Sequence, residues 1–196
     1  MSIEQRSTHV DEKNWFIVMF DLILQECLKA IDGKETFLYL ISPYLYNFRL
    51  PTSWPSFTSN AIYPVSDVEN FNDLIKMARS HGVPVTMQCY PKKTLEKSLG
   101  TNEAWHRKYH DEMLEELHHI GCKITLNPDN HGKLIACSQG ALNSSANVSG
   151  SGADPEKQGN IGDYFPYDDR KDSSYQKKLG WAKEWFDDNK TRAYQP

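Results

Sequence analysis

Residues 131–147 read HGKLIACSQGALNSSAN, and this stretch places polar side chains on both sides of a short apolar run. His131 and Lys133 stand two positions apart, just before residues 134–137, which have the pattern of a buried strand. Side chains alternate along a strand, so this pair points to one face. Because an imidazole can attack phosphorus and an ammonium group can hold phosphate oxygens, we predict a phosphate site here.

Small and polar residues follow at the end of the same stretch. Ser144, Ser145 and Ala146 would let the backbone approach an anion closely, and Ser145 and Asn147 offer hydrogen-bond donors. Ser144 is therefore predicted to bind substrate. A nucleophile, a cation and a polar cradle can hold a phosphate group without a metal ion or a cofactor, so neither is expected. The predicted catalytic residues are His131, as the nucleophile, with Lys133, Ser145 and Asn147.

The segments around this stretch alternate between helical and strand patterns. Apolar residues recur at helical spacing in some segments and form continuous runs in others. This alternating order predicts an α/β fold. The helices are expected at residues 14–31, 70–81, 103–120 and 173–188. The strands are expected at residues 36–42, 83–89, 123–126 and 134–137. Loops are expected at residues 43–68, 90–102 and 149–160.

The charge balance argues against one class of nucleic-acid protein. A net charge of -4 and a pI near 6.0 exclude a protein that coats nucleic acid by bulk charge alone. Local clusters of basic and aromatic side chains are nevertheless typical of single-strand binders. The residues predicted from these clusters to bind substrate are Lys92, Lys93 and Arg107.

The sequence shows no membrane or secretion pattern. The longest apolar stretch, residues 15–24, is interrupted by Asp21 and is too short to span a bilayer. No apolar leader precedes it, and the four cysteines are scattered without a Cys-x-x-Cys pair. We therefore expect a cytoplasmic protein with reduced thiols and no membrane partner.

Other patterns have competing interpretations. His106 and His110 are four positions apart on an expected helix and could bind zinc. They supply only two ligands on that face, so a solvated helix is favoured and no metal site is predicted. The histidine–lysine pair could itself be ordinary surface residues at a strand end, and the polar residues after it could be turn formers.

The stretch 131–147 resembles the signature of the phospholipase D superfamily, which reads H-x-K, four residues, Asp, a short gap and G-S-x-N. His131 and Lys133 match the first part, Ser138 stands at the Asp position, and residues 144–147 stand in place of G-S-x-N. The resemblance covers about residues 35–165. The upstream segments that resemble the family's first core strand and the two helix–strand units before the motif are residues 37–45, 74–85 and 114–124.

The resemblance implies a phospholipase D-like mixed β-sheet with helices on both faces, in a single domain over residues 14–190 after a flexible N-terminus over residues 1–13. It implies a metal-independent phosphodiesterase in which one histidine forms a phosphohistidine and a second protonates the leaving oxygen. Short members with a single motif are mostly nucleases, so DNA or RNA is the expected substrate. Since this chain has one motif, a homodimer that brings two His131 residues together across a two-fold axis is expected.

Departures from the family pattern keep a second interpretation open. Ser138 replaces Asp, Ser144 replaces Gly, and the acid that members often carry after the motif is missing or replaced by Asp163 or Glu156. The alternative is a weakened or inactive phospholipase D-like module that binds nucleic acid or a partner protein in a larger complex, for example in defence. Phospholipid hydrolysis is disfavoured, because no membrane-facing amphipathic helix is evident.

Overall fold

One mixed sheet organises the molecule. The computed structural model describes residues 8–10, 15–50, 68–99, 104–149 and 161–196, and at 8–10, 15, 16, 99 and 104–107 it describes the backbone path. The described strands form an eight-stranded sheet in the order β1-β7-β6-β5-β2-β3-β4-β8. Their bounds are Thr8–Val10 (β1), Leu38–Ile41 (β2), Val85–Cys89 (β3), Lys123–Leu126 (β4), Leu134–Cys137 (β5), Gly140–Ser144 (β6), Gly162–Pro166 (β7) and Arg192–Ala193 (β8).

The centre of the sheet is parallel and its two flanks are antiparallel. Strands β2, β3 and β4 run parallel to one another. Strand β5 lies antiparallel to β2, and the β5–β6 hairpin, β7 and β1 continue the sheet in antiparallel fashion. Leu134 pairs with Ile41, so β5 begins where β2 ends. The residues just before β5 therefore lie at the carboxyl edge of the parallel strands, where open α/β sheets bind their ligands.

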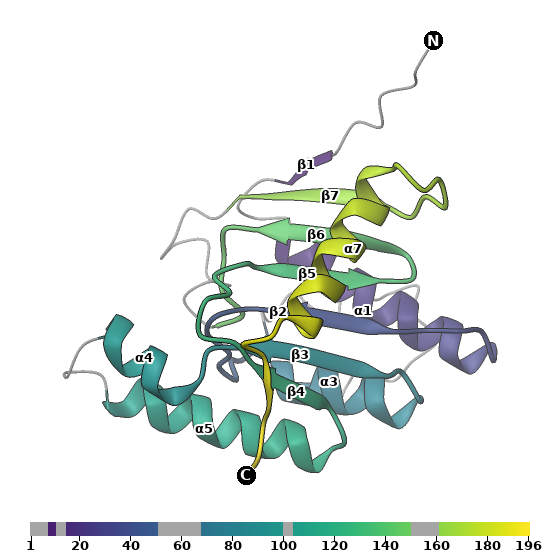
Figure 1. Ribbon diagram of the computed structural model, residues 1–196. Coiled ribbons are helices and arrows are strands. Elements are labelled where there is room, and N and C mark those ends of the chain that lie inside the picture. Colours follow the sequence, from purple (N-terminus) through teal and green to yellow (C-terminus); the bar gives the residue numbers. More distant parts are fainter. Residues whose placement is uncertain (1–7, 11–14, 51–67, 100–103, 150–160) are drawn as a thin grey trace.

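Helices cover both faces of this sheet (Figure 1). Alternating strand residues divide the core into two clusters. The larger cluster packs α1, α3 and α5 on one face, and the smaller packs α7 on the other against β5, β6 and β7. The described helices are Trp15–Ile31 (α1), Phe71–Ser80 (α3), Lys92–Leu99 (α4), Ala104–His119 (α5) and Ser174–Asp187 (α7). The predicted fold class, a mixed sheet with helices on both faces, is confirmed.

Local signals explain where the helices begin and end. Asn70 caps α3 with its side chain, which accepts from the Asp73 amide at 3.1 Å, and the Asp73 carboxylate accepts from the Asn70 amide at 3.2 Å. After α5, Gly121 adopts a φ of 83°, a left-handed conformation that favours glycine and ends the helix. These features place α3 and α5 within a residue or two of their predicted bounds.

Several expectations are corrected. Residues 90–102 were expected to form a loop, but α4 occupies Lys92–Leu99 and buries Leu95. Residues 8–10 of the N-terminal segment expected to be flexible form β1, which pairs with β7, and the rest of that segment lies outside the described residues. The expected loops at 43–68 and 149–160 lie largely outside the described residues. Within the part of the chain that the structure describes, no helix has the length and apolar character needed to cross a membrane.

Candidate active site

His131 and Lys133 lie together at the carboxyl edge of the sheet. The Lys133 Nζ lies 3.2 Å from the His131 Nδ1, and it donates a hydrogen bond to the His131 carbonyl oxygen at 3.0 Å. His131 is exposed, whereas Lys133 is half-buried. This pair brings an accessible imidazole and an ammonium group to one point, as the sequence predicts.

Burial and charge favour the neutral form of the imidazole. Partial burial and the nearby charge of Lys133 lower the pKa of His131 from its ordinary value. Burial also lowers the pKa of Lys133 from its ordinary, strongly basic value. A neutral imidazole has a lone pair for attack on phosphorus, and the ammonium group beside it can neutralise phosphate oxygens.

A buried amide holds the turn that carries the pair. Asn130 is buried, its Oδ1 accepts from the Gly132 amide at 2.9 Å, and its Nδ2 donates to the Gln88 Oε1. Gln88 is itself fully buried on β3 and donates to the Trp185 carbonyl oxygen at 2.9 Å. This network ties His131 to the sheet and to α7. The network is not evident from the sequence, because two polar residues far apart in the chain carry no local signal of their pairing.

Glycine is the only residue type that fits at position 132, between His131 and Lys133. A Cβ built at this position would lie 2.1 Å and 2.8 Å from two carbons of the Trp181 ring. Those separations are far below van der Waals contact, and a rigid indole cannot move aside easily. The middle residue of the motif is therefore dictated by helix α7 packing against the turn.

The structure brings Ser144 next to Lys133, but the other cradle residues are placed differently. The Ser144 amide donates to the Lys133 carbonyl oxygen at 3.0 Å, which extends the β5–β6 pairing by one residue. The exposed Ser145 uses its hydroxyl oxygen to accept from the Ile161 amide at 3.0 Å. Among the described residues, the buried Oδ1 of Asn147 has no hydrogen-bond partner.

The predicted substrate-binding cations lie on the two helices that follow β3. Lys92 and Lys93 are exposed at the start of α4, and Lys92 forms an ion pair with Asp111 at 2.9 Å. Arg107 lies on α5, and its side chain is outside the described part of the chain. Tyr90 precedes α4, and its ring centroid lies 6.2 Å from that of His131.

His110 is a structural residue and does not lie on a solvated face, which corrects our expectation for this helix. It is fully buried, and its ring nitrogens lie 3.1 Å from the Leu45 carbonyl oxygen and 3.3 Å from the Tyr90 carbonyl oxygen. Burial lowers the pKa of His110, so it is neutral and joins α5 to the segments after β2 and β3. The side chain of His106 lies outside the described residues. Across the described ranges, no three potential ligands gather into a metal site.

The acid that the family carries after the motif has no counterpart beside His131 among the described residues. Asp163 lies on β7 in register with Asn143, so it belongs to the sheet face that α7 covers. Alternation along β5 places Lys133 on the other face, with Ile135 and Cys137. Glu156 lies outside the described residues. The position of Asp163 therefore does not suit it to orient the His131 ring.

Ser138, at the position of the family Asp, lies at the end of β5 opposite to His131. Its hydroxyl donates to the Glu26 Oε1 at 2.5 Å, and it accepts from the Lys29 Nζ at 2.5 Å. Glu26 is fully buried on α1, and its other oxygen accepts from the Phe37 amide at 3.1 Å. A carboxylate from α1 therefore sits beside this serine, so the departure at Ser138 belongs to the fold and does not alter the histidine–lysine end of the strand.

We expect Ser138→Ala to lower the free energy of unfolding by about 1–3 kcal/mol, because a fully buried oxygen of Glu26 loses its hydrogen-bond donor. Urea denaturation measures this change. The matched control is Ser80→Ala, an exposed serine at the end of α3, for which a change of no more than about 0.5 kcal/mol is expected. Equal effects at both positions would show that the Ser138–Glu26 bond contributes nothing.

Comparisons with known proteins agree with the fold and are silent on the activity. No protein-family model matches the chain, and no curated protein matches it. Among solved structures, the polyphosphate kinase from Porphyromonas gingivalis is similar, with a TM-score of 0.53 and 12% sequence identity over 97% of this chain. The chain spans only 24% of the length of that kinase chain. At this identity the likeness shows the fold alone.

Proposed function

We propose that this chain is a phosphodiesterase that cleaves DNA or RNA through a phosphohistidine formed on His131. The observation that carries the proposal is the contact of the His131 ring with the Lys133 ammonium group, 3.2 Å apart at the carboxyl edge of the sheet. Nucleic acid is the favoured substrate because the exposed Lys92 and Lys93, at the start of α4, follow the same carboxyl edge of the sheet.

The proposed reaction has two steps. When a phosphodiester binds, the Lys133 ammonium group moves from the imidazole to the phosphate oxygens, which leaves the His131 lone pair free. That lone pair forms a bond to phosphorus, the bond from phosphorus to the leaving oxygen breaks, and a second imidazole, which is protonated at this stage, supplies the proton that this oxygen takes. Water then attacks the phosphohistidine and gives a proton back to the second imidazole, and the P–N bond breaks.

A homodimer would supply the second imidazole. Among the described residues no other histidine contacts His131, since His110 is buried against backbone carbonyls and His118 and His119 lie at the far end of α5. A two-fold axis close to His131 would place the partner's copy across one shared site. The exposure of His131 leaves it accessible for such an arrangement.

The proposed enzyme should cleave in the absence of divalent metal ions. Histidine attack on phosphorus needs no metal-bound water, unlike two-metal nucleases. Labelled single-stranded and double-stranded DNA and RNA, incubated with the purified protein in excess EDTA, should be cut at the same rate as with magnesium. Activity that disappears in EDTA and returns with magnesium would contradict the proposed mechanism.

The purified protein should be a dimer in solution. Light scattering coupled to size exclusion should report twice the chain mass of 22.6 kDa. A mixed dimer with one wild-type chain and one His131→Ala chain should lose activity, because the shared site needs both imidazoles. A protein that remains monomeric while it cleaves would rule out the shared site.

A second candidate function rests on the absence of an acidic residue beside His131 among the described residues. No carboxylate among the described residues hydrogen-bonds the His131 ring, and the ring nitrogen instead faces Lys133. A module of this kind could bind nucleic acid or a partner protein without cleaving. Binding of oligonucleotides that is weakened by Lys92→Glu and Lys93→Glu, with no cleavage under any condition, would favour this second function.

A further inference from the structure

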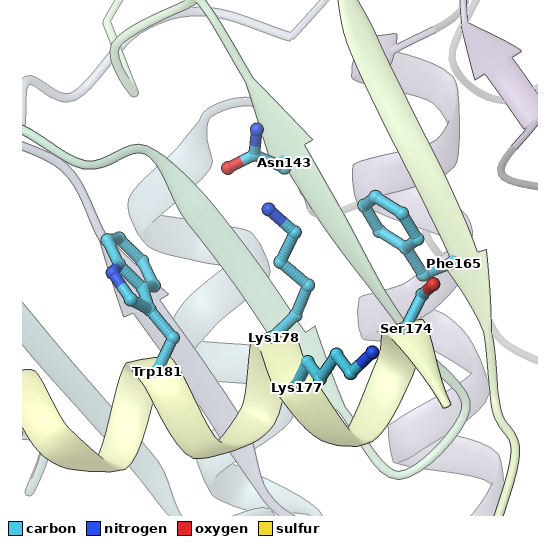
Figure 2. Close-up of a pocket in the computed structure, with 6 residues that line it drawn as sticks. All are labelled: Asn143, Phe165, Ser174, Lys177, Lys178 and Trp181. Atoms are coloured by element: carbon cyan, nitrogen blue, oxygen red, sulfur yellow. The ribbon is translucent and has the colours of Figure 1, made fainter. Parts of the chain in front are cut away.

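A cavity of about 510 Å³ lies on the sheet face that α7 covers, apart from the histidine–lysine pair. It opens between the first turns of α7 and strands β6 and β7 (Figure 2). Its volume falls within the range of small-molecule sites. The residues that line it are Asn143, Phe165, Ser174, Lys177, Lys178 and Trp181.

Two lysines and no acidic residue line the cavity. Neither Lys177 nor Lys178 forms an ion pair with another described residue, and no carboxylate lines the cavity. The Lys178 ammonium group lies 5.3 Å from the centre of the Phe165 ring, and Figure 2 shows this lysine extending from α7 toward Asn143. Two uncompensated cations in a chain with a net charge of -4 indicate a site for an anion.

The cavity also has an aromatic wall. Trp181 contacts Gly132 with the outer edge of its ring and meets Trp185 edge to face, at a centroid distance of 6.2 Å. These contacts hold the indole firmly while it lines the cavity. A rigid indole favours a planar ring as its ligand, and the Asn143 amide beside it can donate and accept hydrogen bonds.

We infer that this cavity binds a nucleotide, either free or as one unit of a nucleic-acid strand. Its phosphate lies against Lys177 and Lys178, and its base stacks beside Trp181 within reach of Asn143. An inorganic anion would leave the aromatic wall unused, and an uncharged ring would leave the lysines unpaired. The combination therefore selects a ligand that carries both groups.

This site is separate from the proposed catalytic centre but in contact with it. Asn143 pairs with Leu134, and both belong to the face under α7, whereas Lys133 belongs to the opposite face. The two sites meet at one point, where Trp181 packs against Gly132 between His131 and Lys133. The inference does not depend on the chain being a nuclease, since neither His131 nor Lys133 lines the cavity.

Calorimetric titration with AMP, adenosine and inorganic phosphate tests the site. AMP should bind at least about ten-fold more tightly than either of the other two probes, because only AMP engages both the lysines and the indole. The double variant Lys177→Ala and Lys178→Ala should weaken AMP binding by about ten-fold or more. The matched control is Lys183→Ala, an exposed lysine of the same helix outside the cavity, which should bind AMP as the wild type does.

Two further measurements test whether the nucleotide binds away from His131 and whether it is free or part of a strand. His131→Ala should leave AMP binding unchanged, which places the nucleotide away from the catalytic pair. If a short single-stranded oligonucleotide displaces AMP, the ligand is a nucleotide within a nucleic-acid strand. If the oligonucleotide does not displace AMP, the ligand is a free nucleotide. The inference is overturned if AMP binds no better than phosphate, if the double variant binds like the wild type, or if His131→Ala abolishes AMP binding.

Discussion

Replacing His131 with alanine is expected to reduce cleavage by at least about 10⁴-fold, below the detection of most assays, because it removes the proposed nucleophile. The fold should survive. His131 is exposed and lies outside the buried core, so the free energy of unfolding should change by no more than about 0.5 kcal/mol. Cleavage of labelled oligonucleotides and urea denaturation measure the two effects.

The matched control for this variant is His119→Ala. His119 is also exposed, and it lies at the last position of α5, where its ring bonds the Glu115 carbonyl oxygen at 2.7 Å. This variant should cleave at the wild-type rate. If His131→Ala also cleaves at that rate, another active site or a contaminating nuclease is responsible for the cleavage.

Lys133→Ala is expected to raise the activation free energy by about 3 kcal/mol, which corresponds to a rate roughly 150-fold lower. The lysine lies against the imidazole, so its ammonium group is the nearest cation to the phosphate oxygens as negative charge develops on them. The effect should fall on kcat more than on KM, since that charge is largest in the transition state. Single-turnover cleavage rates measure it.

The control for the lysine is Lys123→Ala, an exposed lysine on β4, which should leave the rate unchanged. Ser145→Ala and Asn147→Ala should be impaired less than Lys133→Ala, since each removes one neutral group from the cradle. The order of the defects is the diagnostic result. If the serine variant is slower than the lysine variant, the charge of Lys133 is not what stabilises the transition state.

The sequence predicts the elements whose patterns are strong and local. The strands predicted at 123–126 and 134–137 coincide with β4 and β5. The apolar run at 134–137 is recognisable because a strand buried on both faces needs apolar side chains throughout. Strand β6 was missed, since Gly140 and Asn143 weaken its pattern and its pairing with β5 and β7 comes from tertiary contact. Helix α4 was missed because its polar sequence buries only Leu95 among its described side chains.

In the candidate site too, the sequence predicts only the features that depend on local pattern. The closeness of His131 and Lys133 is predicted from strand alternation, and Ser144 reaches Lys133 through the hairpin that joins β5 to β6. The support beneath them is not predictable from local pattern. Asn130 depends on Gln88, and Gly132 depends on Trp181, so both need the folded sheet and α7 before their roles can be seen.

The contact between Gly132 and Trp181 also sets an order of events during synthesis. The motif turn leaves the ribosome well before α7, because Trp181 follows Gly132 by about fifty residues. Until that indole arrives, the turn lacks the packing surface that excludes a side chain at position 132. A nascent chain therefore carries the motif before the packing around its turn is complete.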